Sequence, residues 1–250
     1  MEIVYTKLFQ FIRENTANNT NVILAKILII NLNRIKNMSV EATAYLCNCS
    51  PSTLNRFCNT IGLKNFRYLK KLLNLPKSIC LLQDFNQDLF LEHINANLAE
   101  TNAFLNSMNL DDLIYKIHSA KRIIFIGYQD NQSYTLEFQC KMIELNKYVE
   151  TIGFLDISNK IDEFTKNDLA IFISFQGNLF VGHNGEILDA VKRCQAPTLL
   201  ISQINNEELI NEFTYFIKCG SYSYYGEGKY ALMYILNILY FKYSNFLLSN

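Results

Sequence analysis

Residues 47–66 carry two kinds of side chain that could do chemistry. Their sequence is CNCSPSTLNRFCNTIGLKNF. The three cysteines could bind a metal ion or act as reactive thiols. Between them stand short hydrogen-bonding side chains and one arginine, which are residue types that read base edges in a DNA groove. The spacing of the two sets decides between a metal or thiol site and a DNA-reading helix.

The cysteines lack the spacing of a metal site. Cys47 and Cys49 form a C-x-C pair with no matching second pair, and the histidines at 93, 118 and 183 stand at no ligand-like spacing from it. All seven cysteines are scattered, without a C-x-x-C pair, along a chain of 250 residues that needs no disulfide staples. This usage favours a reducing cytoplasm, and the sequence predicts neither a metal site nor a cofactor.

A helix-turn-helix is the element that would position the polar set. A short helix over 39–46 leads into a turn at Asn48, a residue type that tolerates a left-handed backbone. Ser50 and Pro51 then favour the start of a second helix, and Gly62 favours its end. The apolar residues between them recur at i, i+3, i+4 and i+7, on one helix face: Leu54, Phe57, Cys58 and Ile61. The cysteine in this set is therefore interpreted as a small core residue.

The opposite face of the second helix is polar, as in a recognition helix. The segment 63–73, LKNFRYLKKLL, follows with a basic side suited to phosphates. The residues predicted to contact DNA are Ser52, Thr53, Asn55, Arg56, Lys64, Arg67 and Lys70.

The net charge of zero conceals a division of charge along the chain. Residues 1–80 hold 11 Lys and Arg against 3 Asp and Glu, whereas the remaining residues hold 12 against 20. The charges are therefore +8 and −8, which favours a first domain that faces a polyanion. A basic solvated surface without a partner is the alternative that charge alone leaves open.

The sequence from Met38 to Leu73 resembles the N-terminal domain of RpiR-family bacterial regulators. That family has a capped helix followed by S-x-x-T-[IVL]-x-R-F, [LI]-G-[FL] and F-x-x-[LF]-K. The matching residues here are Ser50, Thr53, Leu54, Arg56, Phe57, Gly62, Leu63, Phe66, Leu69 and Lys70. The chain departs from the pattern at Thr43 and Cys49, where the family commonly has leucine and valine. The resemblance implies duplex DNA as a partner.

The second half of the chain alternates between strands and helices. Short apolar runs of the buried-strand type stand at 121–127, 147–153, 168–174, 196–202 and 214–219, with helical patterns between them. This pattern predicts a doubly wound parallel sheet, with any ligand at the carboxyl ends of the strands. The predicted organisation is multi-domain: an all-α helix-turn-helix domain over 1–78, a linker and connecting helix over 79–107, and an α/β domain over 108–250.

The α/β half resembles the sugar isomerase (SIS) domain that RpiR regulators carry. In that family, glycines and hydroxyls in two loops cradle the phosphate of a phosphosugar. The loops here read IGYQDNQS and ISFQGNLF, so most of those hydroxyls are missing. Two readings stay open: a site with altered chemistry that binds a sugar phosphate or other sugar derivative, and a scaffold that only dimerises. The predicted ligand-binding residues are Gly127, Gln129, Asn131, Ser174, Gln176 and Gly177.

The resulting hypothesis is a cytoplasmic DNA-binding transcriptional regulator of sugar or amino-sugar metabolism genes. It would act as a homodimer or higher oligomer, without catalytic residues. The alternative is a metabolic SIS-fold isomerase, or an inactive relative, with a helical appendage that binds protein. No membrane partner is expected, because the apolar runs at 22–32 and 230–248 contain Lys26, Asn237 and Lys242 and are typical of buried helices.

Overall fold

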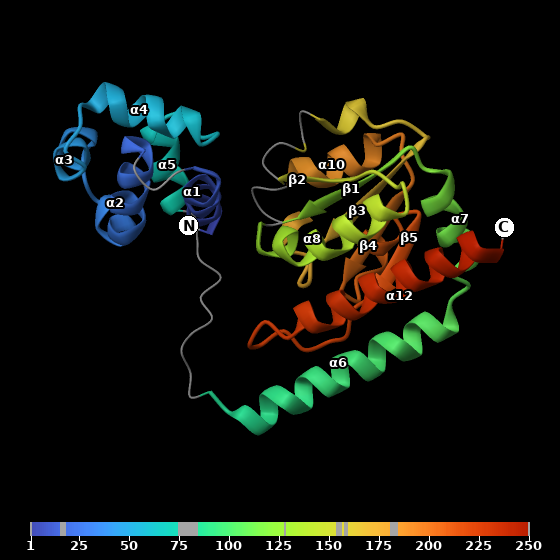
Figure 1. Ribbon diagram of the computed structural model, residues 1–250. Helices are drawn as coiled ribbons and strands as arrows, with labels where there is room; N and C mark the ends of the chain where they lie inside the picture. Colours follow the sequence, from blue (N-terminus) through green and yellow to red (C-terminus); the bar gives the residue numbers. More distant parts are fainter. Residues whose placement is uncertain are drawn as a thin grey trace. The chain divides into compact units, whose positions relative to one another are not determined.

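The computed structural model describes residues 2–15, 19–74, 85–127, 129–153, 157, 160–180 and 185–249 (Figure 1). The chain divides into two compact units, Met1–Ile79 and Cys80–Asn250. They are called the helical unit and the α/β unit below. Each unit has buried core residues of its own.

The described part of the helical unit is built from five helices. They are α1 (Glu2–Glu14), α2 (Thr20–Ile35), α3 (Val40–Leu46), α4 (Pro51–Thr60) and α5 (Phe66–Leu73). Helix α1 packs against α2 and α5, and α4 packs against α3 and α5. Phe57 of α4 lies at the centre, only 1% exposed, with its ring edge-to-face on Phe11 at 5.3 Å.

The α/β unit contains a five-stranded parallel sheet in the order β2-β1-β3-β4-β5. The strands are β1 (Arg122–Gly127), β2 (Val149–Gly153), β3 (Asp168–Ile173), β4 (Thr198–Ser202) and β5 (Tyr215–Lys218). Each strand lies within one of the five apolar runs, which confirms the predicted parallel sheet. Every residue of β3 and β4 is buried, as expected for strands covered on both faces.

Helices cover both faces of this sheet (Figure 1). The residues Ile123 and Phe125 of β1 share one core with α7 (Asp111–Ser119), α8 (Gln129–Glu144) and α12 (Gly228–Ser249). On the other face, Phe172 of β3 packs with Phe180 and Phe213. That face also carries α10 (Gly185–Arg193), with the short elements η1 (Ile161–Glu163), η2 (Asn178–Phe180) and α11 (Glu207–Ile210) completing the unit.

Helix α6 (Gln87–Ser107) is the predicted long connecting helix, and it runs beside α12 (Figure 1). The sequence pattern predicts an apolar side with Leu89, Ile94, Leu98 and Phe104 or Leu105, and of these Leu105 is buried. Asn97, Thr101 and Leu105 are buried, whereas Leu89 is 38% exposed. Two polar residues therefore face the protein interior from this helix. Helix α7 was not predicted from the sequence.

Helix α12 is long and apolar enough to cross a membrane, and within the described ranges no other helix meets that criterion. Its packing in the α/β unit gives another reason for this composition. The helix contacts α6, α7 and α8, and it places Leu232, Ile235 and Leu239 in the main core with no exposed surface. One face of α12 therefore belongs to the core, as predicted for a buried helix, while Met233 and Phe241 are exposed.

An ion-pair cluster ties three strands together at the amino end of the sheet. Arg122 of β1 donates to Asp168 of β3 at 2.9 Å and to Glu150 of β2 at 3.0 Å. Burial of Asp168 by itself would raise its pKa, but hydrogen bonds from Arg122 and Thr165 outweigh burial and hold the pKa below its ordinary value. This carboxylate is only 3% exposed, so its partners replace the water that it gives up.

Candidate functional site

The helical unit brings α3 and α4 together through a tight turn. The Ser39 hydroxyl accepts a hydrogen bond from Ala42 N at 3.1 Å and caps α3. Asn48 has φ 53°, the left-handed conformation predicted for the turn. The Ser50 hydroxyl then caps α4 by accepting from Thr53 N at 3.1 Å, and Pro51 occupies the first turn of that helix. Local sequence thus determines both the turn and the start of α4.

Helix α4 buries the predicted apolar face and leaves its polar face to solvent. Ser52 and Arg56 are exposed, and Thr53 is half-buried beside the capping hydroxyl of Ser50. Asn55 is half-buried and has a structural role, because its Oδ1 accepts from Phe66 N at 3.0 Å and so joins α4 to the start of α5. Among the predicted base-reading side chains, Ser52 and Arg56 are therefore the most accessible.

The basic residues after α4 occupy two kinds of environment. Lys64 and Arg67 are exposed, with the Lys64 ammonium 5.9 Å from the Tyr68 ring centre. Lys70 is half-buried, and its Nζ donates to the Met38 carbonyl oxygen at 2.7 Å. The ammonium of Lys70 thus links α5 to the segment before α3, and a phosphate contact would have to compete with that bond.

The cysteines near α4 pack as small core residues. Burial raises the pKa of Cys47 to about 11 and that of Cys58 to about 12, so both thiols stay protonated near neutral pH. In the part of the chain that the structure describes, no three His, Cys, Asp or Glu side chains are grouped to hold a metal ion.

The carboxyl edge of the sheet holds the second candidate site, where the loops after β1 and β3 were predicted to bind a ligand. Gly127 ends β1 and is buried. Gln129 and Asn131 belong to the first turn of α8 instead of to a loop, and their side chains lie outside the described part. Ser174 is 3% exposed, and its hydroxyl accepts from Leu179 N at 3.2 Å. Ser174 thus stabilises the start of η2.

The loop after β3 still presents amide groups to solvent. Gly177 adopts φ 73°, which lets the chain turn back into η2. Gln176 and Asn178 are exposed, and the Asn178 amide donates to Gln176 Oε1 at 3.1 Å. In turn, Gln176 Nε2 donates to the Ser223 hydroxyl at 2.8 Å. The predicted loop is therefore joined to the segment that follows β5.

That segment, residues 219–227, is the part of the edge that sequence reasoning missed. It is fixed by side chains of α6: Asn97 Nδ2 donates to the Tyr222 carbonyl oxygen at 2.7 Å, and Asn97 Oδ1 accepts from Ser221 N and Tyr222 N. His93 Nδ1 lies 2.9 Å from Glu227 Oε1, and the Glu227 side chain has no exposed surface. Glu227 is thereby assigned a partner that the sequence did not indicate.

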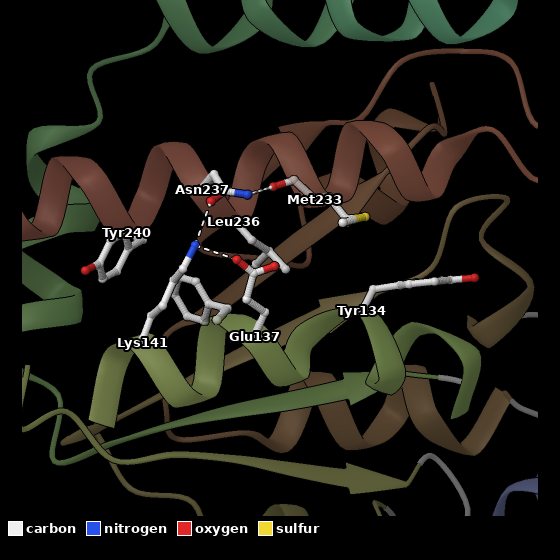
Figure 2. A pocket seen from close by; sticks show the side chains of 8 residues that line it. Tyr134, Glu137, Lys141, Met233, Leu236, Asn237 and Tyr240 are labelled. Carbon is white, nitrogen blue, oxygen red and sulfur yellow. Dashed lines mark hydrogen bonds and ion pairs between the residues drawn. The ribbon is translucent and has the colours of Figure 1, made fainter. Parts of the chain in front are cut away.

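A small cavity with both polar and apolar lining lies between helices α8 and α12 (Figure 2). Lys141 Nζ lies 2.6 Å from Glu137 Oε1 and donates to Asn237 Oδ1 at 3.2 Å, while Tyr240 borders the same space. The cavity volume is about 10 Å³, which is room for about one water molecule. It is too small for a sugar.

Solved structures share this fold at low sequence identity. A Vibrio vulnificus NanR protein complexed with ManNAc-6P is 15% identical, with a TM-score of 0.51 over 96% of this chain and 90% of that chain. The sugar isomerase domain of an RpiR transcription factor from Sphaerobacter thermophilus is 14% identical, with a TM-score of 0.50 over 63% of this chain and 90% of that chain.

A third structure extends the similarity to a protein with an inferred enzymatic function. It is a Methanococcus jannaschii protein for which a 3-hexulose-6-phosphate isomerase function was inferred, 17% identical, with a TM-score of 0.50 over 63% of this chain and 90% of that chain. No family model matches the chain, and no curated protein matches it in sequence. The α/β unit therefore has the fold of sugar isomerase domains.

Proposed function

We propose that this protein is a DNA-binding transcriptional regulator of sugar-metabolism genes. The observation that carries the proposal is the solvent-exposed polar face of α4, the second helix after a tight turn, in the basic part of a chain that is otherwise acidic. Recognition helices present base-reading side chains from this position, and neighbouring cations bind phosphates. We assign Arg56 to base or phosphate contact, and the exposed Lys64 and Arg67 to phosphate contacts.

The similar structures support this proposal by what their names state. One is a NanR protein bound to ManNAc-6P and another is an RpiR transcription factor, so the same α/β fold occurs in regulators and with a sugar phosphate. The NanR similarity extends over 96% of this chain, which includes the helical unit. We infer that the α/β unit here senses a sugar derivative and does not catalyse a reaction.

Replacing Arg56 with alanine is expected to weaken specific DNA binding by about 1–3 kcal/mol, because one bidentate side-chain contact to a base has this value. The measurement is selection of binding sites from a random duplex library at about 50 mM salt, followed by titration of the selected duplex at several salt concentrations. Wild-type affinity should fall linearly on a log–log plot against salt.

Arg193→Ala is the matched control, because Arg193 is an exposed arginine of the α/β unit with only a 3.6 Å contact to Asp162. It should bind like the wild type. The proposal fails if the wild-type chain selects no sequence, or if the Arg56 and Arg193 variants bind equally well.

We also propose that the α/β unit joins two chains, because a single helix-turn-helix reads too few base pairs for useful specificity. Apolar side chains on the adjacent helices α8 and α12 are exposed and could form this contact: Leu136 55%, Ile143 55%, Met233 40% and Phe241 56%.

Sedimentation velocity of the full chain should show a dimer that the double change Leu136→Glu and Phe241→Glu converts to a monomer. Tyr148→Glu, at a residue that is also 55% exposed, is the control and should stay dimeric. A monomeric wild-type chain would contradict this assignment.

A further inference from the structure

Tyr222 is an exposed aromatic residue that is held unusually firmly. Its backbone N–H donates to Asn97 Oδ1 at 2.8 Å, and its carbonyl oxygen accepts from both Asn97 Nδ2 and Gln203 Nε2 at 2.7 Å. Asn97 has no exposed surface and Gln203 is 8% exposed. A buried amide is costly unless it is hydrogen-bonded, and both of these amides bond to the backbone of Tyr222. Two buried side chains therefore fix the position of one surface residue.

The ring of Tyr222 is fixed as well as its backbone. It stacks on the His93 ring with centres 4.2 Å apart and planes inclined by 11°. His93 is itself oriented by the buried carboxylate of Glu227, whose other oxygen accepts from Tyr225 N at 2.7 Å. One face of the tyrosine is thus covered, yet 42% of the residue is exposed. A large side chain held in one orientation loses little entropy when it binds a ligand.

Hydrogen-bonding groups lie in the segments next to Tyr222. Ser223 follows Tyr222 directly and accepts from the amide of Gln176, which is exposed. The segments 174–178, 203–206 and 219–227, which follow three neighbouring strands, contain no Lys or Arg. Ser174, the one hydroxyl that matches a phosphate loop, is buried and engaged with η2. These three segments therefore offer amides, hydroxyls and an aromatic face, but no cationic side chain that could pair with a phosphate.

We propose that this edge binds the uncharged ring of a sugar derivative, with the ring stacked on the open face of Tyr222. The inference rests on the proposed sensing function and narrows it to ligands without a phosphate. The apolar C–H face of a sugar ring packs on an aromatic face, while Gln176 and Ser223 bond to hydroxyl or acetamido groups. Gln176 and Tyr222 then determine specificity, and the half-buried His93 with the buried Asn97 and Glu227 only position the tyrosine.

The test uses the full chain and saturation-transfer NMR with hexoses, N-acetylhexosamines and the 6-phosphate of each. An uncharged member should bind and its 6-phosphate should bind at least about tenfold more weakly, because no cation of these segments offsets the loss of phosphate hydration. Tyr222→Ala should reduce affinity roughly tenfold, the value of about 1.4 kcal/mol for an aromatic contact. Tyr222→Phe should keep the affinity within about threefold, since the ring face is retained.

Tyr224→Ala is the control, because Tyr224 is 50% exposed in the same segment but packs on Tyr225. It should bind like the wild type. The inference is overturned if no uncharged member binds, if a 6-phosphate binds as tightly, or if Tyr222→Ala binds normally. If the wild-type chain selects a DNA sequence but binds no uncharged sugar, this inference alone is overturned. If it binds a sugar but selects no DNA sequence, the proposed regulator function is overturned.

Discussion

Replacing Gly220 with alanine is expected to lower the free energy of unfolding of the α/β unit by about 3 kcal/mol. Gly220 adopts φ 77°, where a Cβ costs about 1–2 kcal/mol. The new Cβ would also lie 2.6 Å from Asn97 Cβ and closer still to its amide oxygen. Since that amide is fully buried and holds Ser221 and Tyr222, moving it would break several hydrogen bonds at once.

The variant Gly226→Ala measures the cost of the positive φ alone, without the clash that a Cβ at Gly220 makes with Asn97. Gly226 has a similar φ of 79°, but no atom lies within 4 Å of the position that its Cβ would take. This variant should lose only about 1 kcal/mol. Hydrogen exchange of the amides in α6 and in residues 219–227 measures both losses within the α/β unit. Equal losses for the two glycines would show that Asn97 can move aside without cost.

Replacing Asp168 with asparagine is expected to cost about 3 kcal/mol, because the neutral amide keeps only one of the two acceptor oxygens, of which one bonds to Arg122 and the other to Thr165. The cost should depend on pH. A carboxyl group whose pKa is lowered by folding stabilises the protein above its unfolded pKa of about 3.9, and this contribution is lost as pH falls through the folded value. The variant should therefore lose less stability to acid than the wild type.

Urea unfolding of the full chain at neutral pH and near pH 3 tests this expectation. Asp162→Asn is the control, because the Asp162 side chain is 67% exposed and its contact to Arg193 is 3.6 Å long. It should change stability by less than about 0.5 kcal/mol. If Asp168→Asn behaves like Asp162→Asn at both pH values, the ion pair contributes nothing to stability.

Local signals in the sequence predicted most helices and the strands, but they did not predict the side-chain hydrogen bonds that join these elements. The Ser50–Pro51 pair and the apolar spacing through Ile61 predicted α4, since caps and periodicity act within a few residues. The apolar runs predicted all five strands for the same reason. The bond between Asn97 and Tyr222 joins residues 125 apart, and no periodicity encodes such a contact.

In helix α6, contacts that the sequence does not reveal decide which residues are buried. Its apolar pattern predicted the buried Leu105 but not the buried Asn97, which faces the interior because the backbone of residues 221–222 satisfies its amide. The same limit applies to Asn55 and Lys70, which resemble DNA contacts in sequence but bond within the helical unit. Single residues with two chemical uses can be assigned only when their neighbours are known.

The position of α12 has a consequence for synthesis of the protein on the ribosome. The helical unit ends before residue 80, so it can fold while the rest of the chain is still being made. The sheet of the α/β unit must wait, since α12, which follows all five strands along the chain, supplies Leu232, Ile235 and Leu239 to its core. Until those residues leave the exit tunnel, apolar surface on β1, β3 and α8 stays uncovered. The nascent chain is therefore expected to need chaperone protection between the emergence of β1 and that of α12.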